Sequence, residues 1–141
     1  MINKIKKIAK LNFERIVESR RHLHQNPELS FKEFKTSKYI QDFLRENNIS
    51  FKSGILKTGV IAEISGGNPT SKEIVLRADI DALPIQEINK VNYRSVNDGI
   101  MHACGHDVHT ASLLGTALIL NELKSEFFGN IKLIFQPGEE K

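Results

Sequence analysis

The sequence predicts an α/β domain in which helices are layered on a mixed, partly parallel sheet. Apolar residues recur at helical spacing over two N-terminal segments and again over residues 107–124. Short apolar runs typical of strands lie at 59–65, 73–79 and 131–135. Because a helix separates the last two strands, we expect these strands to pair in parallel, with functional groups at their carboxyl ends.

The first two helices are predicted from periodicity and from residues that stop or start a helix. Residues 5–23 form an amphipathic pattern that ends before Pro27, which disfavours a helical residue in front of it. Ser30 and Glu33 have the spacing of a capping box, and the apolar pattern of a second helix follows over residues 34–44. We expect both helices to lie outside the chemistry.

The strands follow after the second helix. Residues 59–65 alternate weakly in polarity and are bracketed by glycines, as in a strand. In residues 73–79 a compact apolar run, 74–76, comes directly before Asp79 and Asp81. This arrangement predicts a buried strand whose carboxyl end carries the polar groups.

The remaining chain is expected to form a long loop, a helix and a last strand. Residues 82–103 lack periodicity, and a loop of that length in a compact domain is usually functional. Residues 107–124 predict a largely buried helix, after which Gly129 and Asn130 turn the chain into a buried strand at 131–135. No internal repeat or linker is visible.

The composition is that of an ordinary globular domain. The 141-residue chain is 40% apolar and 26% charged, which argues against a collagen-like, low-complexity or largely disordered protein. Residues 1–52 hold 12 Lys or Arg against 6 acids, but these are spread around helical segments without a pattern typical of nucleic-acid binding. We therefore expect no nucleic-acid partner.

The single cysteine and the lack of long apolar runs favour a cytoplasmic protein. Cys104 has no second cysteine with which to form an intramolecular disulfide. No run approaches the roughly 18 apolar residues that a membrane span needs, so no membrane partner is expected. Residues 1–13 lack the unbroken apolar region of a secretory signal, although their basic, amphipathic character leaves a mitochondrial presequence open.

The densest cluster of chemically active side chains is MHACGHDVH. It contains His102, Cys104, His106, Asp107 and His109 within eight residues. The glycine between Cys104 and His106 lets the backbone bend, so that a thiolate and an imidazole can face one ion. These two ligands favour Zn²⁺, Co²⁺ or Mn²⁺ over Mg²⁺ or Ca²⁺.

Other uses of this cluster remain open. Cys104 could be inert packing, and His102 and His109 could simply cap or hydrogen-bond a loop. Cys104 could also be the nucleophile of a papain-like thiol enzyme, but such a nucleophile takes its histidine from a remote part of the sequence. Here the nearest histidine is two residues away.

Two further groups of charged residues follow predicted strands. Of Glu139 and Glu140, one can bind a metal while its neighbour takes a proton from a metal-bound water and delivers it to a leaving amine. Arg77, Asp79 and Asp81 alternate along an extended chain and should share one face, where the acids could orient a metal-bound histidine. The plainer interpretations are a solvated acidic turn and an internal ion pair.

At these motifs the sequence resembles a family of metal-dependent amidohydrolases that includes hippurate hydrolase, indole-acetyl-amino-acid hydrolases, N-acyl-amino-acid amidohydrolases and N-acetyl-diaminopimelate deacetylase. The matching stretches are RHLHQNPEL (21–29), LRADIDALPI (76–85), MHACGHDVH (101–109) and FQPGEE (135–140). The resemblance implies a layered catalytic domain like that of zinc peptidases, and the hydrolysis of N-acyl amino acids or peptides with one or two ions of Zn, Mn or Co.

The resemblance also implies roles for individual residues. By motif, Cys104, His106 and Glu140 look like metal ligands, Glu139 like the general base, and Asp81, with Asp79, like a residue that organises the catalytic site. His22 and His24 look structural. Gly138 departs from the family, which more often has Ala there, and the change is expected to loosen the turn before the glutamates.

The expected domain organisation follows from the same resemblance. Family members continue well beyond residue 140 with two more metal-binding histidines and a second domain used for dimerisation. We therefore expect residues 1–141 to be the N-terminal part of a metallohydrolase catalytic domain, without the dimerisation or lid domain and with weak or no activity. A homodimer is expected only for the full-length family protein. The alternative is a non-catalytic, truncated metal-binding or interaction module.

Overall fold

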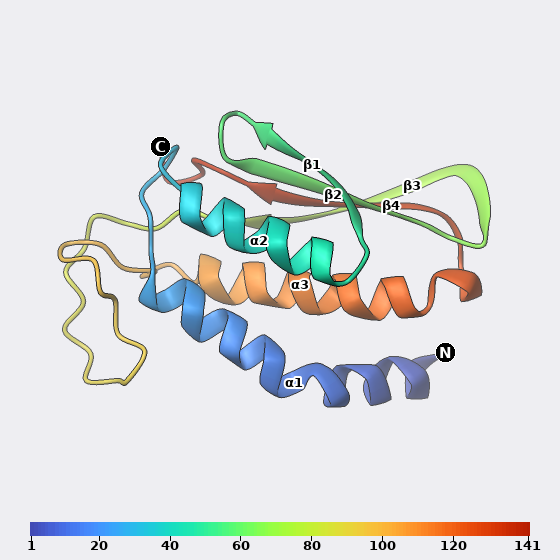
Figure 1. The fold of residues 1–141 in the computed structure, drawn as a ribbon, viewed down its shortest axis with the longest axis horizontal. Coiled ribbons are helices and arrows are strands. Elements are labelled where there is room, and N and C mark those ends of the chain that lie inside the picture. Colours follow the sequence, from blue (N-terminus) through green and yellow to red (C-terminus); the bar gives the residue numbers. More distant parts are fainter.

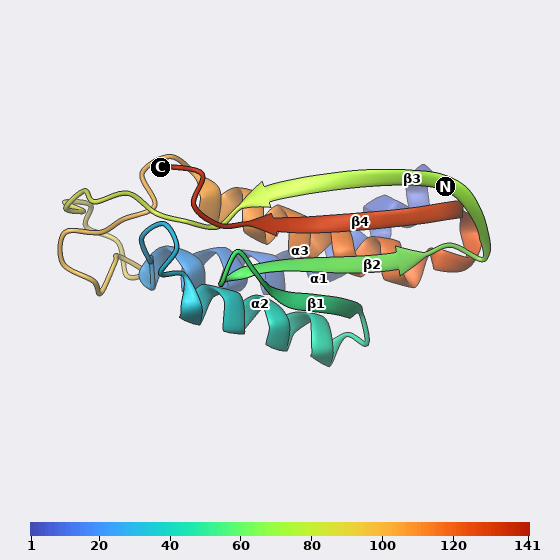
Figure 2. The same cartoon turned by 90° about the horizontal axis from the view of Figure 1, so that it is seen from above.

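The computed structural model describes residues 1–141, apart from the side chains of residues 68–71, and shows a four-stranded sheet with helices layered on one of its faces (Figures 1 and 2). The elements along the chain are α1 (Ile2–Gln25), α2 (Phe34–Glu46), β1 (Ser50–Ile55), β2 (Gly59–Ser65), β3 (Asn68–Asp79), α3 (His106–Glu122), the short 3₁₀ helix η1 (Lys124–Glu126) and β4 (Phe128–Gln136). Within the described part of the chain, no helix is both long and apolar enough to cross a bilayer.

The sheet is mixed, as predicted. Its strand order is β1-β2-β4-β3, with β2 antiparallel to both β1 and β4 and with β3 parallel to β4. Asp79 pairs with Gln136 at the last position of the parallel pair. The carboxyl ends of β3 and β4 therefore meet at one edge, beside the 82–103 loop that projects from the same end of the molecule (Figure 1).

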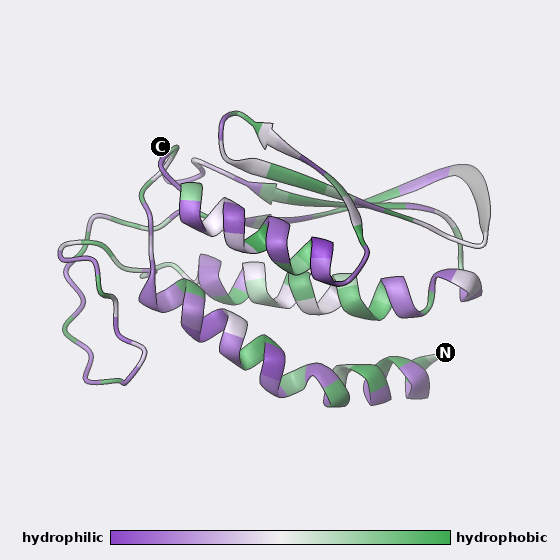
Figure 3. Cartoon of the chain, in the orientation of Figure 1, coloured by the Kyte–Doolittle hydropathy of each residue, from purple (hydrophilic) through white to green (hydrophobic). Residues whose placement is uncertain are grey.

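The core lies between the sheet and the two helices α2 and α3. The side chains of Leu133 and Phe135 from β4 are fully buried there against Ile40 and Leu114. Figure 3 shows the apolar residues concentrated along the central strands and α3. The remaining helix, α1, packs on the α3 helix. A Cβ on Gly115 of α3 would lie 3.2 Å from the side chain of Ile16 of α1. Gly115 thus permits the close approach of α1.

The strand at residues 73–79 exists but is not buried, which corrects the sequence-based expectation. Ile74 is 60% exposed and Val75 is 51% exposed, because β3 lies at the edge of the sheet and pairs only with β4 among the described residues. The sequence analysis also missed β1. That strand has the sequence SFKSGI, in which only Phe51 is even half-buried, so it carries no alternating apolar signal.

The predicted capping box is wrong, although the helix that follows it was predicted correctly. Glu33 occupies the N-cap position of α2 without a capping hydrogen bond from its side chain. Its carboxylate accepts a hydrogen bond from the Phe31 amide at 2.8 Å, and the Ser30 hydroxyl donates to Asp81 at 2.7 Å. Phe31 has a φ of 61°, and this turn directs both side chains into the interior. An amide of the first turn of α2, that of Thr36, instead donates its hydrogen bond to the carboxylate of Glu28, at 2.9 Å.

Candidate metal centre

Three potential metal ligands converge where β4 ends and α3 begins. One ligand atom from each of Cys104, His106 and Glu140 lies within 4.8 Å of the other two. Cys104 precedes α3, His106 is its first residue, and Glu140 lies in the turn after β4. A thiolate, an imidazole and a carboxylate form a donor set that suits Zn²⁺ and the neighbouring transition metals.

Gly105 brings Cys104 and His106 together. Its φ of 112° is one that residues with a side chain rarely adopt. A Cβ at this position would meet no atom within 4 Å. The site therefore needs glycine here for the backbone angle and not for lack of space.

Asp81 connects two of the potential ligands. It is 1% exposed, and its Oδ2 accepts hydrogen bonds from the Ser30 hydroxyl at 2.7 Å and from the Glu140 amide at 2.9 Å. His106 Nδ1 donates to the backbone oxygen of Asp81 at 3.0 Å. Nδ1 must carry the ring proton because that oxygen can only accept, so the lone pair of Nε2 is left for a metal.

Asp81 is held as a carboxylate. Burial alone would raise its pKa, but the hydrogen bonds from the Glu140 amide and the Ser30 hydroxyl outweigh burial and lower the pKa below its ordinary value. The negative charge lies on the Nδ1 side of the imidazole, with Asp81 Oδ1 at 3.3 Å from His106 Nδ1. Such a carboxylate fixes the ring orientation and makes Nε2 a better electron donor.

Glu139 and Glu140 both face His106 but differ in exposure. Their carboxylates lie 3.7 and 3.8 Å from His106 Nε2, and the Glu139 side chain is 42% exposed against 21% for Glu140. The turn that carries them is anchored at Gly138, whose amide donates to Glu33 Oε1 at 3.0 Å. Gly138 has a φ of 68°, and a Cβ there would lie 2.4 Å from the Phe31 ring. Glycine therefore fits this turn, at the position where the family that the sequence resembles more often has Ala.

The surroundings of Cys104 do not suit a thiol nucleophile. Local desolvation and the negative charges of Glu140 and Glu139 raise the pKa of the Cys104 thiol. Catalytic cysteines instead have a lowered pKa, usually from a nearby positive charge. A cation among Cys104, Glu139 and Glu140 would reverse this effect, because coordination favours the thiolate.

The expected convergence of Arg77 with both aspartates is not observed. Arg77 pairs with Asp79 at 2.6 Å, whereas Asp81 contacts Ser30, Glu140 and His106. The strand ends at Asp79, so the strict alternation on which the expectation rested stops before Asp81. Asp79 contributes negative charge near Cys104, and only Asp81 is part of the hydrogen-bonded site.

The two other histidines of the MHACGHDVH motif lie outside the three-ligand group. His102 is buried, and within the described part of the chain neither of its ring nitrogens has a hydrogen-bond partner. Burial lowers the pKa of His102 to about 4, so its ring is neutral at pH 7. His109 is exposed, with its ring centroid 5.9 Å from that of His106.

Sequence analysis missed a group of ionisable residues next to this site, of which three are buried and one, Arg20, is half-buried. Arg20 and His24 of α1 meet Asp107 of α3, and His24 also meets Glu87 of the 82–103 loop. We call these four residues the buried charge chain. His24 and Asp107 both lie in recognised motifs, but nothing in the sequence indicates that residues 83 positions apart pair.

Glu87 should contribute stability that depends on pH. Burial raises its pKa, but hydrogen bonds from the Ser95 amide and His24 outweigh this and lower the pKa below the ordinary value of 4.5. Stability from such a group is present above the unfolded-state pKa and is lost as the pH falls through the folded-state pKa. We expect Glu87→Gln to lower the free energy of unfolding by about 1–3 kcal/mol at pH 7.

The measurement is urea unfolding of both proteins at several pH values from 7 down to about 3, around the ordinary carboxyl pKa. The difference between the two proteins should shrink as the pH falls below 4.5. A difference that stays constant across this range would contradict the assigned pKa direction.

The sequence matches a known peptidase family. Residues 75–141 match the family described as Peptidase family M20/M25/M40. Over 127 residues the chain is 52% identical to the N-acetylcysteine deacetylase of Bacillus subtilis, a match that covers 89% of this chain and 33% of the relative. The N-acyl-L-amino acid amidohydrolase of Geobacillus stearothermophilus is 46% identical over 125 residues, with 89% of this chain and 34% of the relative covered.

Solved structures agree with these sequence matches. A crystal structure from Bacillus subtilis, described as a dinuclear metal-binding peptidase of the M20 family, superposes with a TM-score of 0.89 and 51% sequence identity. The match covers 93% of this chain and 37% of the solved one. The chain thus spans about a third of the length of the relatives it matches.

Proposed function

Because residues 75–141 of this chain belong to peptidase family M20/M25/M40, we propose that residues 1–141 supply the N-terminal part of the catalytic domain of a metal-dependent hydrolase. Its reaction is cleavage of the amide bond of a small N-acyl amino acid or peptide. The names of the deacetylase and amidohydrolase relatives support this substrate class. Dimerisation is proposed only for a full-length protein.

The convergence of Cys104, His106 and Glu140 is the observation that carries the proposal. We assign these three residues as metal ligands, with Asp81 holding His106 so that Nε2 faces the ion. The soft thiolate favours Zn²⁺ or Co²⁺, and Mn²⁺ remains compatible with the carboxylate and imidazole. When bound, one or two such ions would polarise the substrate carbonyl and lower the pKa of a coordinated water toward about 7.

Glu139 is proposed as the general base. Its carboxylate lies 3.7 Å from His106 Nε2, on the side where the three ligand atoms meet, and it is more exposed than Glu140. From this position it can take a proton from the attacking water and deliver it to the leaving nitrogen when the amide bond breaks. Glu139 thereby acts first as a base and then as an acid.

The 141-residue chain alone is expected to hydrolyse substrate slowly. The three-ligand group is open to solvent at Glu139, whose side chain is 42% exposed. Exclusion of water and exact placement of the substrate supply a large share of enzymatic rates. We therefore separate two tests, one of metal binding by this chain and one of hydrolysis in a longer protein.

The metal-binding test is calorimetric titration of the chain with Zn²⁺. We expect wild-type protein to bind, and Cys104→Ala to bind at least about 100-fold more weakly because it removes a charged ligand. His109→Ala is the matched control, since His109 is exposed and lies outside the three-ligand group. Equal affinity in Cys104→Ala and wild type would contradict the proposed site.

A non-catalytic metal-binding or interaction module is the second candidate. The exposed edge of β3, with Ile74 and Val75 open to solvent, favours it. The two candidates differ in a chimera in which residues 1–141 replace the aligned third of the Bacillus subtilis N-acetylcysteine deacetylase. Metal-dependent release of acetate from N-acetylcysteine supports the enzyme, whereas a folded chimera that binds Zn²⁺ without hydrolysis supports the module.

A further inference from the structure

We propose that the buried charge chain of Arg20, Asp107, His24 and Glu87 is a positioning device that sets the distance between Cys104 and His106 for metal binding. None of the four residues is among the three proposed metal ligands. The inference rests on the proposed function only in assuming that those ligands bind a metal. It assigns a role to residues of α1, a helix that the sequence places outside the chemistry.

The contacts within the chain are short, and His24, Asp107 and Glu87 are shielded from solvent. His24 Nδ1 lies 2.7 Å from Asp107 Oδ2, and His24 Nε2 lies 3.0 Å from Glu87 Oε1. Arg20 Nε lies 2.9 Å from the same oxygen of Asp107. His24 is 5% exposed, and Asp107 and Glu87 are each 1% exposed. The imidazole therefore bridges two buried carboxylates.

The two carboxylates of the chain are paired with His24 and Arg20. Each ring nitrogen of His24 faces a carboxylate oxygen, and its Nδ1 also lies 3.2 Å from Arg20 Nη2. The guanidinium of Arg20 offsets the charge of Asp107. Buried charges of this kind are tolerated when they are paired and hydrogen-bonded, and removal of one partner leaves an uncompensated charge in the interior.

One end of the chain fixes the start of α3. Asp107 directly follows His106, and its second oxygen, Oδ1, accepts a hydrogen bond from the Val108 amide at 2.9 Å. The first turn of α3 is thereby tied through Asp107 to His24 on α1. Since His106 is the first residue of this turn, its backbone moves with Asp107.

The other end fixes the loop that leads to Cys104. Glu87 Oε2 accepts from the Ser95 amide at 2.7 Å, and Glu87 Oε1 accepts from Asn89 at 3.2 Å. The Val96 amide adds a bond of 2.9 Å to the backbone of Gln25, next to His24. His24 thus holds the 82–103 loop on one side and α3 on the other, and Cys104 lies between them.

Such anchoring matters because the link between the two ligands is soft. Gly105 joins Cys104 to His106, and glycine permits many backbone angles besides its φ of 112°. A metal site tolerates displacements of only about 0.5 Å in its ligands. Asp81 orients the His106 ring, while the buried charge chain holds the two backbone segments that flank Gly105.

The test is a Co²⁺ titration of the 141-residue chain, followed by the thiolate-to-cobalt charge-transfer band and the visible bands of Co²⁺. We expect His24→Asn to bind Co²⁺ about 10- to 100-fold more weakly than wild type, with visible bands of changed energy or intensity. Asp107→Asn keeps the side-chain shape and an acceptor for the Val108 amide but loses the charge, and we expect a similar loss of affinity.

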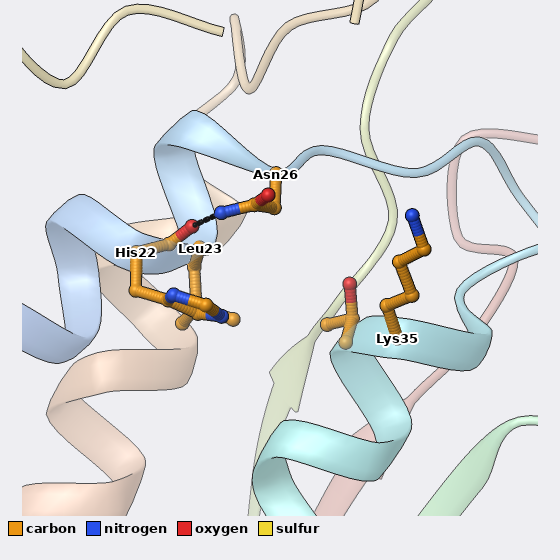
Figure 4. A pocket seen from close by; sticks show the side chains of 5 residues that line it. His22, Leu23, Asn26 and Lys35 are labelled. Carbon is orange, nitrogen blue, oxygen red and sulfur yellow. Dashed lines mark hydrogen bonds between the residues drawn. The ribbon is translucent and has the colours of Figure 1, made fainter. Parts of the chain in front are cut away.

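His22→Asn is the matched control. His22 lies two residues before His24 on the same helix, but it lines a small pocket with Asn26, which directly follows α1, and Lys35 of α2, as Figure 4 shows. Its ring stacks on Tyr39 at 4.3 Å. Because it contacts neither α3 nor the 82–103 loop in these interactions, we expect wild-type Co²⁺ affinity and spectrum.

A second control separates positioning from general loss of stability. Ile40→Ala removes a core side chain of α2 and should lower the free energy of unfolding, but it should leave the Co²⁺ spectrum unchanged.

If His24→Asn does not fold, the test is made with Asp107→Asn and the milder Glu87→Gln. Wild-type affinity and spectrum in the folded variants of His24, Asp107 and Glu87 would overturn the inference and leave the metal centre standing. Absence of Co²⁺ binding by wild-type protein would overturn the proposed metal centre itself.

Discussion

Replacing Glu139 by Gln should reduce the turnover of N-acetylcysteine by about 10²- to 10⁴-fold in the chimera with the Bacillus subtilis deacetylase. Glutamine keeps the size of the side chain but cannot take a proton from water. Because Glu139 is not among the three proposed ligands, metal affinity should stay close to that of the parent chimera. The measurements are kcat at saturating Zn²⁺ and a parallel calorimetric titration.

The neighbouring glutamate provides the comparison for this prediction. Glu140→Gln should weaken Zn²⁺ binding, since Glu140 is one of the three converging ligands. Glu122→Gln, a change in the last residue of α3, should alter neither quantity. Full turnover in Glu139→Gln would show that another group moves the proton.

Glu33→Ala should destabilise the fold by about 3 kcal/mol or more, because it leaves three donors without an acceptor, one of them the fully buried hydroxyl of Thr58. The Glu33 side chain is fully buried, and its carboxylate accepts from the amides of Phe31 and Gly138 and from the hydroxyl of Thr58. These three donors come from the turn before α2, the turn between β1 and β2, and the turn after β4. The free energy of unfolding is measured by urea denaturation.

Glu46→Ala is the control for this prediction. Glu46 lies at the other end of α2, and its 69% exposed side chain forms an ion pair of 3.5 Å with Arg15. An exposed pair of this kind contributes at most about 1 kcal/mol. A Glu33→Ala protein no less stable than Glu46→Ala would mean that water replaces the lost carboxylate.

The elements with a strong local signal were predicted from sequence, and those that depend on tertiary context were not. The glycine-bracketed run at 59–65 corresponds to β2, and α3 begins within one residue of its expected start. The apolar run Ile74–Leu76 was interpreted as buried because composition does not distinguish a central strand from an edge strand. The capping-box spacing was likewise outweighed by tertiary hydrogen bonds to the carboxyl end of β3 and β4.

The candidate site shows the same division. The placement of Cys104 and His106 side by side needs only one flexible residue between them. Gly105 is that residue, so this part of the site could be predicted from the sequence. Glu140 reaches them through the parallel pairing of β3 and β4, so its part in the group came from motif resemblance and not from spacing. The pairing of His24 with Asp107 depends on how α1 crosses α3, and no local pattern encodes it.

The position of β4 has a consequence for how the chain folds. β4 is the last strand of the described sequence but lies second from the edge of the sheet, between β2 and β3. During synthesis the β1–β2 hairpin and β3 therefore emerge before the strand that joins them. Pairing over such long sequence separations is slow and leaves strand edges exposed in the meantime. Folding of this sheet should thus be completed only after residues 128–136 have left the ribosome.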